Sequence, residues 1–124
     1  IQMLEVIADP AYHPLVFHCG VGKDRTGMLA AILLNVLNVS DKDIIIDYAI
    51  TDAFMDEIRE RIISAPETTE EIKTLPDFTW RAEPGTMSLF LSLFKKEYGS
   101  AAGYLKKHGA DKTLVRRLEK ALLV

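Results

Sequence analysis

The chain has 124 residues, with 15 Lys and Arg against 18 Asp and Glu, so its formal net charge is −3. Hydrophobic residues make up 48% and charged residues 27% of the chain, which is typical of a globular protein and excludes a disordered or collagen-like one. A single cysteine, Cys19, excludes a disulfide scaffold and a cysteine-rich zinc site. We therefore interpret residues 1–124 as one domain.

The first elements alternate between helical patterns and breaks. Apolar residues recur at helical spacing over residues 1–8, and prolines at positions 10 and 14 end that pattern. Residues 15–18 predict a short buried strand, followed by a glycine-containing loop. From residue 26 to about residue 37 the chain is apolar on all sides, which predicts a helix buried at the centre of the fold.

The second half of the chain predicts mainly helices. A helix capped by Ser40 continues to about residue 65, and helices follow over residues 84–98, 100–108 and 111–123. Residues 66–84 are rich in Pro, Thr and Glu and predict a long connection, which is either a plain linker or a lid over an active site.

The predicted fold class is therefore α/β and predominantly helical, with about six helices and one strand. A lone strand leaves backbone groups without partners. We expect the chain to be an N-terminally truncated piece of a longer domain, or else to cover the strand as a homodimer. In that homodimer, residues 1–18 would pair or exchange between copies.

The charge of the chain is unevenly distributed. Residues 95–124 contain 8 basic and 3 acidic residues, interleaved with leucines at helical spacing, so we interpret them as the exposed faces of amphipathic helices. On that interpretation we expect no nucleic-acid partner. We also expect no membrane insertion, because no apolar run approaches the roughly 18 residues of a spanning helix. No leader is visible at residue 1, which favours a cytoplasmic protein, although a signal in a preceding segment stays open.

The most informative stretch is HCGVGKDRTG, from His18 to Gly27. A short loop containing Gly20 and Gly22 can turn its backbone N–H groups inward as an anion nest, and the following helix adds its N-terminal dipole. The same field lowers the pKa of the Cys19 thiol and makes the sulfur a nucleophile. Arg25, six positions later, can hold two phosphoryl oxygens in its planar fork.

This stretch resembles the signature H-C-x-x-G-x-x-R-[ST]-G of the cysteine-dependent protein tyrosine phosphatase superfamily at every specified position. The longer string H-C-x-x-G-K-D-R-T-G is similar to that of atypical bacterial tyrosine and lipid phosphatases of dual to triple specificity. The resemblance extends to residues 39–48 and 98–105, so the chain looks like the C-terminal half of that family's catalytic domain.

The resemblance implies phosphomonoester hydrolysis through a phosphocysteine, without a metal or other cofactor. Its substrates would be phosphotyrosine and also phosphoserine, phosphothreonine or phosphoinositides. Cys19 would attack phosphorus, Thr26 would hydrogen-bond the thiolate, and His18 would orient the loop. The substrate would be bound, beside Arg25, by the residues of the loop itself: Gly20, Val21, Gly22 and Lys23. Lys23 would add positive charge for a multiply phosphorylated headgroup.

The resemblance also implies a general acid. The common members of the family take it from an aspartate on a separate upstream loop, but only Asp9 is available before Cys19 and it is badly placed. The lipid-phosphatase-like group uses an aspartate directly before the arginine, which is the position of Asp24. Asp24 is therefore the expected acid and then base, or else a charge partner of Arg25 or Lys23.

Other classes of phosphate and redox site fit less well. A nucleotide-binding P-loop needs Ser or Thr after Gly-Lys, where this chain has Asp24. Arsenate reductases and thioredoxin-like proteins call on further thiols, and the chain has one cysteine. The alternative that stays open is a non-catalytic phosphate-binding module or an inactive fragment of a larger phosphatase.

Overall fold

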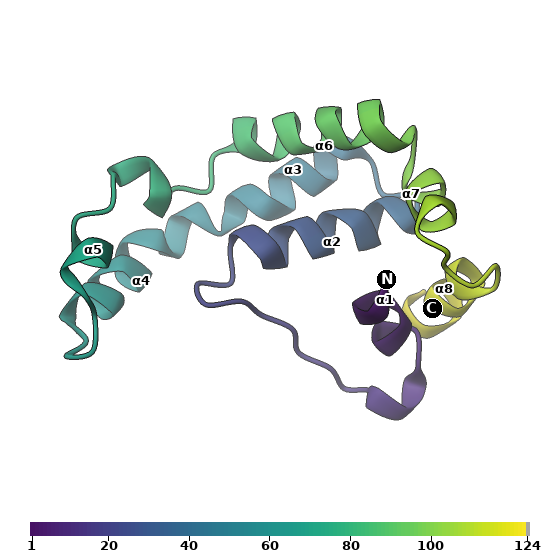
Figure 1. The fold of residues 1–124 in the computed structure, drawn as a ribbon, viewed down its shortest axis with the longest axis horizontal. Helices are drawn as coiled ribbons and strands as arrows, with labels where there is room; N and C mark the ends of the chain where they lie inside the picture. Colours follow the sequence, from purple (N-terminus) through teal and green to yellow (C-terminus); the bar gives the residue numbers. More distant parts are fainter. Residues whose placement is uncertain (124) are drawn as a thin grey trace.

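The computed structural model describes residues 1–123, and the molecule is elongated (Figure 1). Every regular element among these residues is a helix, so the predominantly helical fold is confirmed. The elements are, in chain order, α1 (Gln2–Ile7), η1 (Pro10–Tyr12), α2 (Asp24–Val36), α3 (Asp41–Ile50), α4 (Asp52–Ser64), α5 (Glu70–Lys73), η2 (Asp77–Trp80), α6 (Pro84–Tyr98), α7 (Ala101–Lys107) and α8 (Leu114–Leu122), with η for a 3-10 helix. None of the helices within residues 1–123 has the length and apolar character of a membrane-spanning segment.

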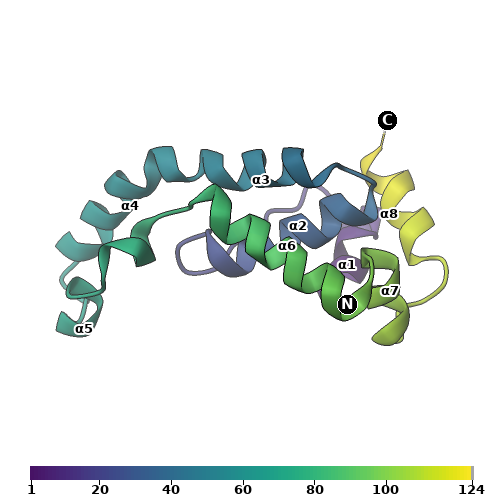
Figure 2. The same ribbon diagram turned by 90° about the horizontal axis from the view of Figure 1, so that it is seen from above.

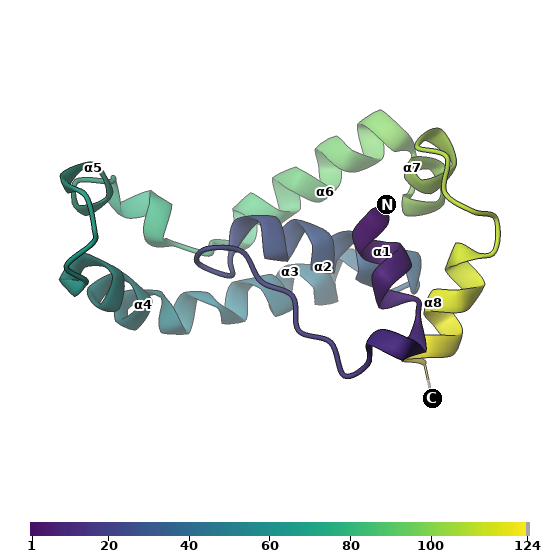
Figure 3. The ribbon, with the colours of Figure 1, turned by 60° about the horizontal axis from the view of Figure 1, so that its bottom comes forward.

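The strand predicted over residues 15–18 is wrong, because no residue from 1 to 123 is in a strand. The segment runs extended from η1 to the start of α2 (Figure 3). Its side chains alternate as they would in a strand: Leu15 and Phe17 are half-buried, whereas Val16 is 87% exposed. Residues 14–22 form no backbone-to-backbone hydrogen bond in the described structure. A strand needs a neighbour for its ladder, and none is present among these residues.

Three helices lie along the middle of the molecule, where α2, α3 and α6 run side by side (Figures 1 and 2). The predicted central helix is α2. Ser40 caps α3 by accepting a hydrogen bond from the Asp43 N–H at 3.2 Å, as expected from the sequence. The buried side chains between these helices come from all three elements and from the chain just before α6: Ala31, Ile44, Tyr48, Ala82, Met87 and Leu91.

A second apolar cluster lies at the end of the molecule where α1, α7 and α8 meet (Figure 1). Leu114 and Leu118 of α8 are 0% exposed, and Leu4 of α1 packs into the same cluster. The basic side chains of α7 and α8 are mostly exposed, at positions 106, 107, 116 and 120. The expected amphipathic character of this basic segment is thereby confirmed.

The opposite end of the molecule consists of α4, α5 and η2 (Figure 1). The helix predicted to run from residue 40 to about residue 65 is divided at Thr51 into α3 and α4. Short-range turn bonds, from Thr51 N to Tyr48 O and from Phe54 N to Thr51 O, replace the helical ladder there. The connection 66–84 is not structureless, since it contains α5 and η2.

Candidate active site

The loop between the extended segment and α2 wraps its polar groups around the Cys19 sulfur. The Thr26 hydroxyl hydrogen-bonds the sulfur, and the backbone N–H groups of Thr26, Gly22 and Val21 donate to it. Thr26 Oγ1 also accepts the Cys19 N–H at 2.9 Å, so one hydroxyl both donates and accepts. The N–H groups therefore converge on one point, as the sequence predicts for an anion nest.

These contacts change the acidity of Cys19. The Thr26 hydroxyl and then the three backbone N–H groups lower the pKa of the thiol from 9.0 to about 6, although partial burial acts in the opposite direction. Hydrogen bonds of this kind favour the charged form of an acid. At neutral pH most of the sulfur is thus a thiolate, the form of cysteine that is a nucleophile.

One of the two loop glycines has a conformational reason to be glycine. Gly22 has φ = +75°, a left-handed conformation that other residues adopt only at a cost, and it directs its N–H toward the sulfur. Gly20 has no positive φ, and a Cβ there would meet nothing within 4 Å. The sequence predicts that both glycines are needed for the conformation of the loop or for close approach. The structure shows such a reason at Gly22 and none at Gly20.

Arg25 faces the same cavity as the sulfur. Cys19, Arg25 and Thr26 line a cavity of about 350 Å³, whose walls are completed by the apolar side chains of Ile1, Met3, Phe17 and Leu29 together with His18. Arg25 forms no ion pair within residues 1–123. A thiolate, a guanidinium and an apolar wall in one cavity can bind and attack an aryl phosphate.

His18 lies beside the loop with its ring exposed. Its Nδ1 is 3.0 Å from the Cys19 carbonyl oxygen, and because a carbonyl only accepts, Nδ1–H is the donor. The ring thus holds the backbone carbonyl of Cys19.

Lys23 and Asp24 are placed away from this cavity. The Lys23 ammonium is buried against η2 and the residue that follows it, where it donates to the carbonyl oxygens of Thr79 and Arg81. Asp24 pairs with Lys23 at 3.3 Å and lines a separate cavity of about 110 Å³ between α2, α3 and α6. The sequence predicts that all the loop residues contribute to one site. In the structure, Cys19, Arg25 and Thr26 line one cavity, whereas Lys23 and Asp24 make their contacts elsewhere.

The contact of Lys23 with the carbonyl oxygens of Thr79 and Arg81 is the feature of the site that sequence reasoning missed. The two acceptors are backbone carbonyls, which every residue carries. No pattern in the sequence could have marked them.

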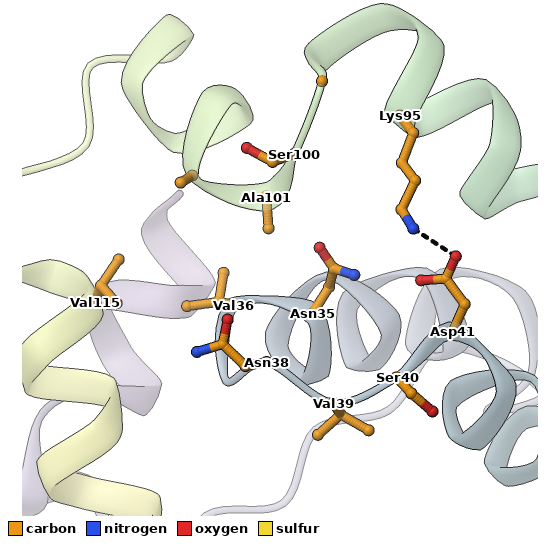
Figure 4. Close-up of a pocket in the computed structure, with 12 residues that line it drawn as sticks. Asn35, Val36, Asn38, Val39, Ser40, Asp41, Lys95, Ser100, Ala101 and Val115 are labelled. Carbon is orange, nitrogen blue, oxygen red and sulfur yellow. Dashed lines mark hydrogen bonds and ion pairs between the residues drawn. The ribbon is translucent and has the colours of Figure 1, made fainter.

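A cavity larger than that of Cys19 lies elsewhere. It has a volume of about 530 Å³ and opens where the end of α2 faces α6 and α7 (Figure 4). Asp41 and Lys95 form an ion pair at 2.5 Å on its rim. It contains none of the loop residues, so its size alone does not make it the site of the chemistry. No group of three His, Cys, Asp or Glu side chains that could hold a metal ion occurs in residues 1–123.

Comparison with known proteins agrees with the chemistry of the loop. Residues 1–124 match the tyrosine phosphatase family. The chain is 29% identical over 125 residues to a tyrosine-protein phosphatase of Nostoc commune, an alignment that covers 95% of this chain and 42% of that protein. It is 30% identical over 125 residues to the triple specificity protein phosphatase PtpB of Mycobacterium tuberculosis, covering 91% and 45% respectively. The chain thus spans less than half the length of these relatives. Because the family match extends over the whole chain, this protein belongs to the tyrosine phosphatase family.

Proposed function

We propose that this chain carries the centre of a phosphatase that hydrolyses phosphomonoesters through a phosphocysteine at Cys19. The observation that supports this most is the surroundings of the Cys19 sulfur, where the Thr26 hydroxyl and the loop N–H groups lower the pKa of the thiol to about 6. The position of Arg25 in the same cavity adds a cation for the phosphoryl oxygens.

In the first step, the Cys19 thiolate attacks phosphorus in line, and a sulfur–phosphorus bond forms as the bond to the ester oxygen breaks. Asp24, which pairs with Lys23 and lines a neighbouring cavity in this structure, turns toward the Cys19 cavity when substrate binds and gives its proton to the departing oxygen. Arg25 and the loop N–H groups hold the other phosphoryl oxygens, where negative charge is concentrated in the transition state.

In the second step, water attacks the phosphocysteine and gives a proton to the Asp24 carboxylate. The sulfur–phosphorus bond breaks and inorganic phosphate leaves. The Thr26 hydroxyl stabilises the thiolate that departs, as it stabilises the resting one. Asp24 has room to make this turn and to accept the proton from water, because its side chain is 65% exposed; it directly precedes Arg25 in the chain.

The proposed substrates are phosphotyrosine and, beyond it, phosphoserine, phosphothreonine or phosphoinositides. The apolar side chains of Phe17 and Leu29 beside the sulfur fit an aromatic ring. The name of one relative, a triple specificity protein phosphatase, supports a range wider than phosphotyrosine.

Turnover of p-nitrophenyl phosphate in the presence of EDTA tests the proposal. We expect the native chain to release nitrophenolate and the Cys19→Ser variant to release none, because a serine hydroxyl lacks the lowered pKa of the thiol. If the native chain binds phosphate but turns nothing over, the chain is a phosphate-binding module. Equal turnover by the two proteins would exclude Cys19 as the nucleophile.

We also propose that the 124-residue chain self-associates through residues 1–18. The extended segment has no partner strand within residues 1–123, and Val16 is 87% exposed. Edge-to-edge pairing is the usual way in which such a segment satisfies its backbone. The cytoplasmic location expected from the sequence stays a prediction.

A further inference from the structure

Lys23 is the one charged residue of the described structure whose side chain is buried, with 6% of it exposed. Its ammonium donates to the carbonyl oxygens of Thr79 at 2.8 Å and Arg81 at 2.9 Å. A third contact, at 3.3 Å, joins it to the Asp24 carboxylate. An ammonium has three N–H groups and accepts nothing. Two of them donate to carbonyl oxygens, and the charge is paired with the Asp24 carboxylate. Lys23 is therefore engaged with partners inside the protein and does not line the Cys19 cavity.

The chain that receives these hydrogen bonds, residues 77–82, is held from its other side by α4. The Ala82 N–H donates to Asp52 Oδ1 at 2.7 Å. Arg81 forms ion pairs with Asp52 at 3.6 Å and Asp56 at 3.4 Å. The segment is therefore clamped between the loop and α4, which gives the lysine a fixed anchor.

Lys23 also occupies a sensitive place in the loop. It precedes α2 directly, between Gly22, whose N–H donates to the sulfur, and Arg25, which lines the cavity. A shift of its backbone would move both groups. Removing a partner from a buried ammonium is costly, so the anchor resists such a shift.

We propose that Lys23 is a positioning residue that ties the phosphate-binding loop to residues 77–82 and so keeps the Gly22 N–H and Arg25 aimed at the phosphate. This inference deepens the proposed function and rests on it. It replaces the headgroup-binding role that the sequence suggested for Lys23. The geometry of the loop then depends on a segment that lies more than fifty positions away in the chain.

The Lys23→Met variant tests the tether by two measurements that need no turnover. Trp80 is the single tryptophan, it is 4% exposed, and it lies within the clamped segment. We expect its fluorescence emission to shift to longer wavelength as the segment detaches. We also expect the pH at which iodoacetamide alkylation of Cys19 is half-maximal to rise from about 6 toward 9.0, because the loop N–H groups no longer converge on the sulfur.

Steady-state kinetics of the Lys23→Met variant then distinguish a positioning role of Lys23 from a substrate-binding role. A misplaced loop lowers kcat for p-nitrophenyl phosphate and for a phosphoinositide by the same factor, roughly 10- to 100-fold. The Lys107→Met variant is the matched control, since it removes a lysine from an exposed ion pair with Glu97 and should leave all these readouts unchanged.

Unchanged Trp80 emission and an unchanged alkylation profile in Lys23→Met would overturn the tether. A rise in KM for the phosphoinositide alone would do the same and restore the headgroup-binding role. If the native chain turns nothing over, the proposed function fails, while fluorescence and alkylation still decide the tether.

A second variant covers the case in which Lys23→Met does not fold. Asp52→Ala frees residues 77–82 from the α4 side, whereas Asp52→Asn keeps an acceptor oxygen for the Ala82 N–H. We expect Asp52→Ala, and not Asp52→Asn, to shift both Trp80 emission and Cys19 alkylation. A shift in Trp80 emission with native alkylation would show that the segment does not position the loop.

Discussion

Two cations of the same loop have opposite surroundings. Arg25 lines the cavity of Cys19 without an ion pair in residues 1–123, while Lys23 is buried, donates to two carbonyl oxygens and pairs with Asp24. A guanidinium at the open cavity suits bidentate contact with a phosphoryl group. A compact ammonium suits a buried contact with carbonyl oxygens. The distribution of partners thus assigns a different task to each residue.

The Thr26→Val variant tests how Cys19 acquires its acidity. Thr26 makes the largest contribution to the lowered thiol pKa, and valine keeps the shape of the side chain without the hydroxyl. We expect the pKa to rise from about 6 toward 9.0. At pH 7 the thiolate fraction, and with it the rate of alkylation by iodoacetamide, falls severalfold or more. A native pH profile in Thr26→Val would contradict this account.

The Asp24→Asn variant tests the general acid. An acid matters most when the departing oxygen is a poor leaving group. We expect kcat to fall by roughly 100-fold or more for an alkyl phosphate and by much less for p-nitrophenyl phosphate. Steady-state kinetics on the two substrates measure the difference. Equal losses would assign Asp24 to the ion pair with Lys23 alone.

Among the elements, α2 connects the site to the rest of the molecule. Its first turn carries Arg25 and Thr26, and its buried side chains reach both apolar clusters. The close approach of this first turn to α3 depends on Gly27. A Cβ at Gly27 would lie 2.8 Å from Cδ2 and 3.0 Å from Cε2 of the buried Tyr48 ring. The last glycine of the signature is therefore a packing residue.

The Gly27→Ala variant tests this packing. Alanine is favoured over glycine in a helix by about 1 kcal/mol, whereas overpacking a core costs about 1–3 kcal/mol. We expect a net loss of stability of about 1 kcal/mol in urea unfolding. Gly85→Ala is the matched control, because Gly85 is helical and a Cβ there meets nothing within 4 Å. That variant should be neutral or stabilised; an equal loss in both would exclude Tyr48 as the cause.

At the scale of the whole molecule, apolar side chains are fully buried at one end, whereas the extended segment is partly exposed to solvent. The cluster of α1, α7 and α8 includes Leu114 and Leu118 at 0% exposure, while Val16 is almost fully exposed and its backbone is unpaired. The chain also spans less than half the length of its relatives. Because the unpaired extended segment lies directly before Cys19 in the chain, the state of association bears on the candidate site.

Light scattering under reducing conditions tests the proposed self-association. We expect a dimer at tens of micromolar, and a Val16→Lys variant shifted toward monomer because a charge in the paired segment opposes edge-to-edge contact. Ile50→Lys is the control, since Ile50 is 58% exposed on α3. A clean monomer of the native chain would contradict the proposal, as would a dimer that Val16→Lys leaves intact.

Much of the fold could be predicted from the sequence because helix signals are local. Periodicity, Ser40 and the glycine after α6 located each predicted helical stretch. The division at Thr51 was missed because neither glycine nor proline marks it in the sequence. The break is also slight, since the backbone dihedrals of Thr51 stay helical (φ −56°, ψ −31°). The strand was wrong because alternation of side chains is local, whereas a strand exists only with a neighbour.

The sequence by itself determined which groups the proposed chemistry uses. Cys19, Arg25 and Thr26 stand within eight consecutive residues, so the chain places them together locally. The tertiary structure alone decided what Lys23 and Gly27 do, because their partners belong to other elements: backbone carbonyls beside η2 and the ring of Tyr48 on α3. The type of a side chain limits the interactions that a residue can form, and the packing of distant elements decides which of those interactions it forms.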